Sequence, residues 1–324
     1  MSIFENLGFS DLGIGPLQSD DEMTVVPIVG PSRGNIAGPE NLRFSRTSGY
    51  GTMVFKNDDQ DRPAIVPSNY MVRGKGAQDH AMAGSGVVAS RRSAEFDNAC
   101  CVESTQGGLL RPDGNDEDIL PVELRKALLD PSVRSRTKYD KLWSRISSWM
   151  EGILPGQRRL GRDRAHIRDF YDEPSIKQAL EDFAASFEPV ENQIGAVIMF
   201  AGVPVGIEIM PSPEHWEAYW KYLIRGCYGA EMVRLKALGK IRPSALILPE
   251  FPKDAPPDQV EKILGDFSTH IQEEVLPLLK DIQINSQELG HTGSLRTSLL
   301  HTDSGGGGDM IKEDETPVYL SLVL

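Results

Sequence analysis

Residues 194–216 read IGAVIMFAGVPVGIEIMPSPEHW, and this stretch decides the fold. Residues 194–200 are apolar and rich in β-branched side chains, and Ala201-Gly202 can form a tight turn. Residues 203–209 then alternate between apolar and other side chains, which predicts a hairpin with one half-buried strand. Ser212 is a good helix N-cap and Pro213 suits the first helical position, so we expect a helix directly after the hairpin.

The sequence on both sides of this hairpin is mixed. The tract 23–102 carries short apolar runs between turn-forming stretches, which is typical of a β-rich region. A breaker-rich loop at 111–118 precedes helical spacing over 142–153 and 176–187. The apolar C-terminus, 318–324, is expected to pair into a sheet. The predicted fold class is α+β, with a β-rich N-terminal part, a helical layer, and the central hairpin and C-terminal strand joining the sheet.

The domain organisation follows from the same patterns. Residues 1–22 lack sustained periodicity and are predicted to form a flexible arm. Residues 23–324 are predicted to form one large α+β domain, with a possible subdivision into 23–110, β-rich, and 120–324, helical plus hairpin. A further helix with an internal proline is expected near 257–282.

Composition limits the class of protein. The chain has 324 residues, 40% hydrophobic and 25% charged, with a formal net charge of −13. This charge argues against broad binding of nucleic acid or of an anionic membrane. The three cysteines show no zinc-type spacing, and neither a signal peptide nor a membrane span is visible. We therefore expect a cytoplasmic protein without a metal or a cofactor.

The segment 73–80, RGKGAQDH, combines a flexible backbone with cationic and acid–base side chains. A glycine-rich loop with Lys75 can hold phosphate through backbone N–H groups, although such loops are also common as structural turns. Asp79 and His80 would point to opposite faces of a strand, which is poor geometry for an acid–base pair. Cys101 lies near Glu103, whose negative charge would raise the thiol pKa, so a buried structural cysteine is the simpler interpretation.

Two further groups are candidates for partner binding. The arginines of the segment 155–168 can bind phosphate or an acidic partner, or can form a solvated surface. The helix after the hairpin carries tryptophans and His215, and these side chains can line a pocket or pack on the sheet. The predicted partner-binding residues are Arg158, Arg159, Arg162, Arg164, Trp216 and Trp220.

Several stretches in order resemble a known family. Residues 76–80, GAQDH, are followed by SGVV at 85–88, CCVESTQG at 100–107, Leu142-Trp143 and the block 187–233. Their order and spacing are similar to the ADP-ribosylglycohydrolase- and rhodanese-phosphatase-associated protein family. The resemblance implies a link, by gene neighbourhood, to prokaryotic conflict systems and to ADP-ribose chemistry.

The sequence also departs from the family pattern. An acidic Asp-Gly-Glu stretch is replaced by Pro67 to Tyr70, and Gln-Asn-Arg by Gln78, Asp79 and His80. The Cys-Val-Glu triplet remains, but the Gly-Arg-Trp that follows has become 107–109, GGL. Loss of an acidic group and of an arginine would remove proton-transfer and anion-binding capacity.

The favoured hypothesis is therefore a non-catalytic interaction or ligand-binding protein, such as a phage-encoded adaptor or assembly factor. The alternative is an enzyme that acts on ADP-ribose or a related nucleotide, and a nucleic-acid-binding protein using the arginines is a third. We expect a protein partner and a nucleotide-type small molecule. The predicted ligand-binding residues are Lys75, Gln78, Asp79 and Cys101, and the residues for any catalysis are Gln78, His80 and Glu103.

Overall fold

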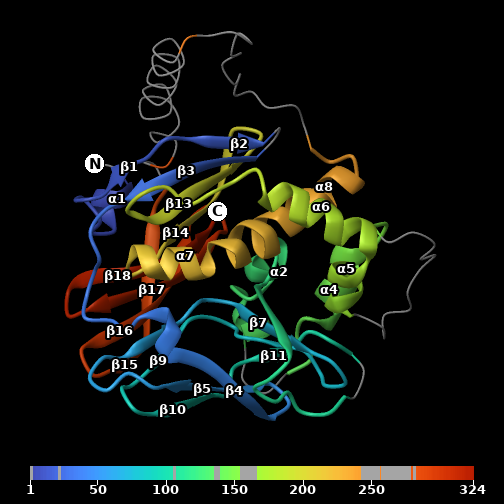
Figure 1. Cartoon of the computed structure of the whole chain (residues 1–324), viewed down its shortest axis with the longest axis horizontal. Helices are drawn as coiled ribbons and strands as arrows, with labels where there is room; N and C mark the ends of the chain where they lie inside the picture. Colours follow the sequence, from blue (N-terminus) through green and yellow to red (C-terminus); the bar gives the residue numbers. More distant parts are fainter. Residues whose placement is uncertain are drawn as a thin grey trace.

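The computed structural model describes residues 3–20, 23–104, 107–134, 139–153, 166–241, 256, 279 and 282–324. Its largest element is a nine-stranded antiparallel sheet in the order β1-β3-β13-β14-β18-β17-β16-β15, with β2 also paired to β3 (Figure 1). The strands are β1 Gly13–Ile14, β2 Gln18–Asp20, β3 Met23–Val29, β13 Gln193–Phe200, β14 Val203–Ile209, β15 Ile284–Thr292, β16 Leu295–Thr302, β17 Gly307–Glu313 and β18 Thr316–Val323.

The central hairpin is formed by β13 and β14, as the sequence predicts. Ala201 and Gly202 both have positive φ, at 47° and 80°, which is the backbone conformation of a two-residue hairpin turn that follows the twist of the strands. The C-terminal strand β18 pairs with β14, while β13 pairs with β3. The predicted hairpin and C-terminal strand therefore join one sheet, and the α+β class is confirmed.

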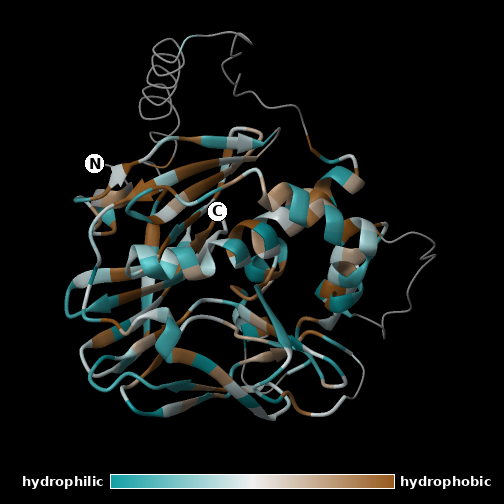
Figure 2. Cartoon of the chain, viewed as in Figure 1, coloured by the Kyte–Doolittle hydropathy of each residue, from teal (hydrophilic) through white to brown (hydrophobic). Residues whose placement is uncertain are grey.

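Both faces of this sheet are covered. On one face Val25 and Ile198 pack in the same core as Trp216 of the helix α7, Pro213–Lys221. On the other face Val26 and Val197 pack with Phe9, which follows the short helix α1, Ile3–Asn6. Two-sided burial explains why β3 and β13 read as continuous apolar runs rather than as alternating ones. Figure 2 shows these strands largely in the hydrophobic colour, whereas the helices beside them carry large hydrophilic areas.

Residues 39–119 form three smaller sheets beneath the large one (Figure 1). One contains β4 Leu42–Gly49, β5 Thr52–Asn57 and β10 Ser93–Phe96, and a second contains β6 Ala64–Val66 and β9 Gly86–Val88. The third contains β7 Tyr70–Gly74, β8 His80–Ala81, β11 Cys100–Cys101 and β12 Asn115–Ile119. A short 3-10 helix, η1 Pro39–Asn41, leads into β4.

The helical layer lies to one side of the sheets (Figure 1). It comprises α2 Val122–Ala127, α3 Pro131–Arg134, α4 Trp143–Met150, α5 Ile167–Asp172, α6 Pro174–Ala184 and α8 Ala230–Ala237. The helix α7 begins at the predicted N-cap Ser212, but it continues into a π-helix, η2 Tyr222–Gly229, before α8. The sequence predicted a helix after the hairpin, but not its π-helical segment.

A buried ion pair joins the helical layer to the large sheet. Arg125 of α2 donates to Glu208 of β14 at 2.7 Å and to the hydroxyl of Ser321 in β18 at 2.6 Å. The side chains of Arg125 and Glu208 are 2% and 0% exposed. Tyr228 of η2 also donates to Glu208, at 2.6 Å. These hydrogen bonds connect three parts of the chain that are distant in sequence.

The N-terminal segment differs from the flexible arm that the sequence predicts. Residues 3–20, expected to form a flexible arm, contain α1 and the strands β1 and β2, which pair with β3. The helix expected near 257–282 lies almost entirely outside the described residues. The single domain over 23–324 stays a prediction.

Candidate functional site

Two of the motifs that carry the family resemblance meet beside the sheet of β7, β8, β11 and β12. We call Gln78, Asp79, Glu103, His166 and Arg168 the motif cluster. Gln78 and Asp79 precede β8, Glu103 follows β11, and His166 and Arg168 lie at the start of α5. An isolated bridge pairs Glu103 with His166, and this bridge brings α5 to the motifs.

Asp79 and Arg168 form the charged part of the motif cluster. Arg168 Nε donates to Asp79 Oδ2 at 3.1 Å, and its Nη2 donates both to Asp79 Oδ1 and to the carbonyl of Gly74. The backbone N–H of Gly74 donates to Asp79 Oδ1 at 3.0 Å. Burial raises the pKa of Asp79 to about 6, although the bonds from Arg168 lower it. Asp79 is therefore charged at pH 7, and its oxygens are occupied by internal donors.

His80 and Cys101 face each other in the interior, each with a fully buried side chain. His80 Nε2 accepts the Gly51 N–H at 3.2 Å and lies 3.3 Å from Cys101 Sγ, and Nδ1 lies 2.8 Å from the Gln78 carbonyl. Because the carbonyl only accepts, Nδ1 carries the proton and Nε2 is the acceptor. Burial lowers the pKa of His80 and raises that of Cys101 to about 12. The pair is neutral and closed to solvent, so Cys101 is no nucleophile.

Gln78, Glu103 and His166 form the more open part of the motif cluster. Gln78 Nε2 donates to the Glu103 carbonyl at 2.8 Å, while Gln78 Oε1 is buried without a hydrogen-bond partner among the described residues. His166 Nδ1 lies 3.6 Å from Glu103 Oε1, and these two side chains are 17% and 18% exposed. A carboxylate and an imidazole therefore lie together at a rim that solvent can reach.

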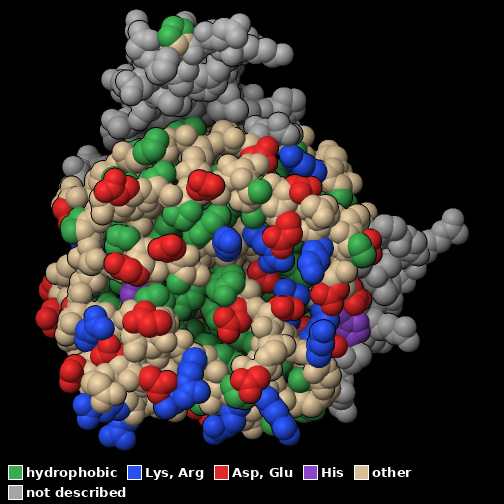
Figure 3. All heavy atoms as spheres, in the orientation of Figure 1, with side chains coloured by type: hydrophobic (Ala, Val, Ile, Leu, Met, Phe, Trp, Pro, Cys, Tyr) green, Lys and Arg blue, Asp and Glu red, His purple; other side chains and the backbone are tan. Residues whose placement is uncertain are grey.

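A pocket of about 760 Å³ is lined by the loop that connects β7 to β8, and we call it the loop pocket. Its wall includes Gly74 to Ala77 and Gly108, and exposed cations stand around it: Arg46, Lys75 and Arg111. Within the part of the chain that the structure describes, none of these three forms an ion pair. Asp113 also lines the pocket. Figure 3 shows Lys and Arg side chains gathered along the lower edge of this face, over β4, β5 and β10.

The motif cluster holds the loop that lines this pocket. Asp79 and Arg168 bind the N–H and the carbonyl of Gly74, and Gln78 N–H donates to the Gly108 carbonyl at 2.9 Å. Gly76 has a φ of 72°, a backbone conformation that residues other than glycine rarely adopt. Hydrogen bonds of Asp79, Arg168 and Gln78 thus hold the loop in place, and its glycines and Lys75 line the pocket.

Of the four predicted ligand-binding residues, three lie close to the loop pocket and one does not. Lys75, Gln78 and Asp79 lie at or behind the loop pocket, whereas Cys101 is sealed against His80. The expected catalytic group of Gln78, His80 and Glu103 is connected through backbone carbonyls, and the Nε2 of the His80 ring lies against Cys101 Sγ.

The partner-binding predictions fare differently. Trp216 is 2% exposed because it packs against the large sheet, so the prediction of a partner contact there is wrong. Trp220 is half-buried and stays a prediction. Arg158, Arg159, Arg162 and Arg164 lie outside the described residues. Sequence reasoning missed His166, and it grouped Arg168 with the charged run of arginines.

Two further tests bear on ligands and membranes. Among the residues that the structure describes, no group of three or more His, Cys, Asp or Glu side chains could hold a metal ion. Over the same residues, no helix has the length and apolar character needed to cross a membrane.

Comparison with known proteins gives one match. Residues 11–301 match the model of the ARG and Rhodanese-Phosphatase-superfamily-associated Protein domain, a range that includes the motif cluster and the loop pocket. No curated protein and no solved structure matches the chain. The matched range covers well over half of the sequence, so the chain belongs to the ARG and Rhodanese-Phosphatase-superfamily-associated Protein domain family.

Proposed function

We propose that this chain is a non-catalytic ligand-binding and interaction protein, and that its loop pocket takes an anionic, nucleotide-type ligand such as ADP-ribose. The observation that carries the proposal is the fixation of the loop by Asp79 and Arg168, which bind the two peptide groups of Gly74. A loop held in one conformation before binding loses less conformational entropy when a ligand arrives. Glycine backbone beside a lysine is a common way to hold phosphate.

The charges around the loop pocket support an anionic ligand. Lys75, Arg46 and Arg111 outnumber Asp113, although the whole chain carries a net charge of −13. An unpaired surface cation in an acidic protein attracts an anion locally and at short range, because salt screens exposed charges beyond about 10 Å. The family name, in which ARG stands for ADP-ribosylglycohydrolase, directs the choice of ADP-ribose as the first ligand to test.

The same geometry argues against catalysis by the motif residues. His80 and Cys101 are sealed and neutral, and the oxygens of Asp79 are engaged by Arg168 and Gly74. A general base needs a free lone pair within hydrogen-bond distance of the substrate proton. These three groups offer none to a ligand in the loop pocket.

One observation favours the alternative, an enzyme that acts on ADP-ribose or a related nucleotide. Glu103 and His166 lie 3.6 Å apart at the rim, beside the buried and unpartnered Oε1 of Gln78. A carboxylate beside an imidazole is a recognised acid–base arrangement. The alternative requires that Glu103→Gln abolish turnover.

The wider context belongs to the same proposal. We place the protein in the cytoplasm of a prokaryote or of a phage-infected host, where it would bind a protein partner as an adaptor or assembly factor in a conflict system. The family association with two classes of enzyme supports a protein partner.

Titration calorimetry with ADP-ribose tests the binding. Lys75→Ala should weaken the affinity about tenfold or more, because a hydrogen bond to a charged group contributes about 1.5–3 kcal/mol and tenfold in Kd is about 1.4 kcal/mol. The matched control is Lys240→Ala, since Lys240 is exposed and does not line the loop pocket. Added salt should weaken binding by the wild type more than by Lys75→Ala. Equal affinities for the wild type and Lys75→Ala, or no binding at all, would contradict the proposal.

A further inference from the structure

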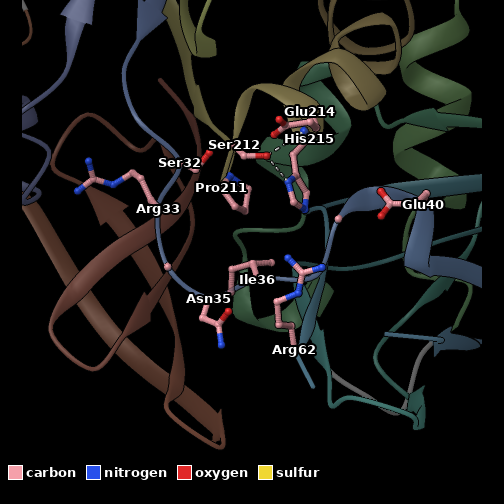
Figure 4. A pocket seen from close by; sticks show the side chains of 12 residues that line it. Ser32, Arg33, Asn35, Ile36, Glu40, Arg62, Pro211, Ser212, Glu214 and His215 are labelled. Atoms are coloured by element: carbon pink, nitrogen blue, oxygen red, sulfur yellow. Dashed lines mark hydrogen bonds between the residues drawn. The ribbon is translucent and has the colours of Figure 1, made fainter. Parts of the chain in front are cut away.

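A second pocket lies apart from the loop pocket and shares none of its lining residues. It has a volume of about 330 Å³ and lies between the segment 32–40, Arg62 and the start of α7 (Figure 4). Ser212 and His215 form one wall, and Asn35, Ile36 and Arg62 lie opposite (Figure 4). We call it the Ser212 pocket.

The two wall residues have the relation of a nucleophile and its base. Ser212 Oγ lies 2.8 Å from His215 Nδ1, and His215 Nε2 lies 2.9 Å from the carbonyl oxygen of Ala37. The Ala37 carbonyl can only accept, so Nε2 carries the proton of the neutral ring. Nδ1 is then a bare acceptor, and the Ser212 hydroxyl is the donor. A hydroxyl, an imidazole and a third group that orients the imidazole are the general signature of an activated serine.

We propose that Ser212 is a nucleophile, with His215 as its general base, and that the Ser212 pocket accepts short-chain carboxylic esters. In the first step the hydroxyl proton passes to His215 Nδ1, Ser212 Oγ bonds to the ester carbonyl carbon, and the departing alkoxide takes that proton and leaves as an alcohol. In the second step a water molecule loses a proton to Nδ1 and attacks the acyl-serine, and Ser212 regains its proton as the acid leaves. This activity goes beyond the proposed function, which concerns the loop pocket.

The pocket lining indicates the class of substrate. The charged side chains that line it, Arg33, Arg62, Glu40 and Glu214, balance in sign, and Ile36 and Pro211 are its main apolar walls. A long acyl chain is therefore disfavoured. Arg62 lies across the pocket and points toward the His215 side (Figure 4). Its Nε and Nη2 bind Asp59 Oδ2, which leaves Nη1 to face a carbonyl oxygen that gains negative charge.

The protonation of His215 supports this arrangement. Burial lowers the pKa of His215, with Arg62 acting in the same direction, while the Ala37 carbonyl, Glu214 and Glu40 act to raise it. The ring is thus neutral at pH 7, as a general base must be. The nearby Ser212 hydroxyl also lowers the pKa of Glu214. One hydroxyl proton serves one acceptor at a time, so protonation of His215 would direct Ser212 to Glu214.

Ser212 also caps α7, and the test must separate capping from reactivity. Its Oγ accepts the His215 N–H at 3.4 Å. Ser212→Asn keeps a good N-cap but has no nucleophile. His215→Gln keeps a donor for the Ala37 carbonyl but has no base. The matched control is Ser48→Ala, because Ser48 is exposed and does not line the Ser212 pocket.

The experiment measures labelling of the full chain by diisopropyl fluorophosphate, with the modified residue located by mass spectrometry, alongside release of p-nitrophenol from p-nitrophenyl acetate. The proposal predicts labelling at Ser212 in the wild type and in Ser48→Ala, and at least a tenfold slower reaction in Ser212→Asn and His215→Gln. The labelling rate should fall as the pH drops through the lowered pKa of His215 and should be level above it. Labelling that is absent, or that persists in His215→Gln, or a rate proportional to hydroxide with no plateau, would overturn the proposal and leave Ser212 as a helix cap only.

Discussion

Arg168 binds both carboxylate oxygens of Asp79 across 89 positions of sequence, and the same guanidinium binds the carbonyl of Gly74. The Asp79 side chain is fully buried, whereas that of Arg168 is 23% exposed. Because Gly74 begins the loop that lines the loop pocket, this ion pair connects α5 to the proposed ligand site. Its role is to position the loop.

Removal of Arg168 should cost far more stability when Asp79 is present than when Asp79 has been replaced. Arg168→Ala leaves a buried carboxylate without its counter-charge, so the free energy of unfolding should fall by about 3 kcal/mol. The same change in an Asp79→Asn background should cost about 1 kcal/mol or less, because no charge is stranded. Urea denaturation of the four proteins measures both values, and additive single-variant losses would show that the pair is not coupled.

The buried His80 predicts an acid-dependent loss of stability. Its pKa is lowered by burial in the folded chain, while the unfolded value is about 6.5. Between the folded pKa and about 6.5 the unfolded chain binds a proton that the folded chain does not, so stability falls as the pH drops in this window. His80→Asn lacks this proton, and its deficit in stability relative to the wild type should shrink from pH 7.5 to pH 5. Denaturant titrations at both values check it, and a constant deficit would contradict the buried, neutral His80.

The cysteines should be unreactive in the folded chain. Burial raises the pKa values of Cys100, Cys101 and Cys227 to about 12 each, and all three side chains are fully buried. Since the thiolate is the reactive form, we expect no labelling by a disulfide reagent at pH 7 on a timescale of minutes, and three labelled thiols after unfolding. Rapid labelling of Cys101 in the native protein would instead indicate an open, activated thiol.

The ion pair of Arg125 and Glu208 should contribute strongly to the stability of the contact between α2 and the large sheet. Arg125→Ala strands a fully buried carboxylate and should lower the free energy of unfolding by about 3–5 kcal/mol, measured by urea denaturation. The control is Arg296→Ala, whose partner Glu315 is exposed, and which should cost less than about 1 kcal/mol.

The domain organisation can be tested by calorimetry of the wild type. A single domain over 23–324 requires one cooperative transition, and two resolved transitions would favour the division into 23–110 and 120–324.

Local features of the fold could be predicted because local residues determine them. The turn at Ala201-Gly202 and the cap at Ser212 depend on neighbours within a few positions, and both occur where the sequence placed them. The π-helix at 222–229 could not be predicted in this way. Its backbone departs from the 3.6-residue period although its apolar spacing reads as a regular helix, and Gly226 lies close against Asp118 of β12.

The sequence identified several residues of the site but not the contacts between them. The sequence marked Lys75, Gln78 and Asp79 as polar residues on a glycine-rich loop, but it did not show that Arg168 would satisfy Asp79. That pairing depends on where α5 packs, and α5 is fixed by the bridge between Glu103 and His166. The proximity of Ser212 and His215 was visible as a helix start, yet the role of Ala37 in orienting the ring needs the fold.

Phosphorus and proton NMR of ADP-ribose mixed with an equal amount of protein at pH 7 tests the central claim most directly, because it observes binding and cleavage in one sample. The account predicts shifted diphosphate resonances in the presence of the wild type, little shift with Lys75→Ala, and a ligand that stays intact over hours. A ligand converted to products at a rate that Glu103→Gln abolishes would contradict it and would establish the enzyme alternative.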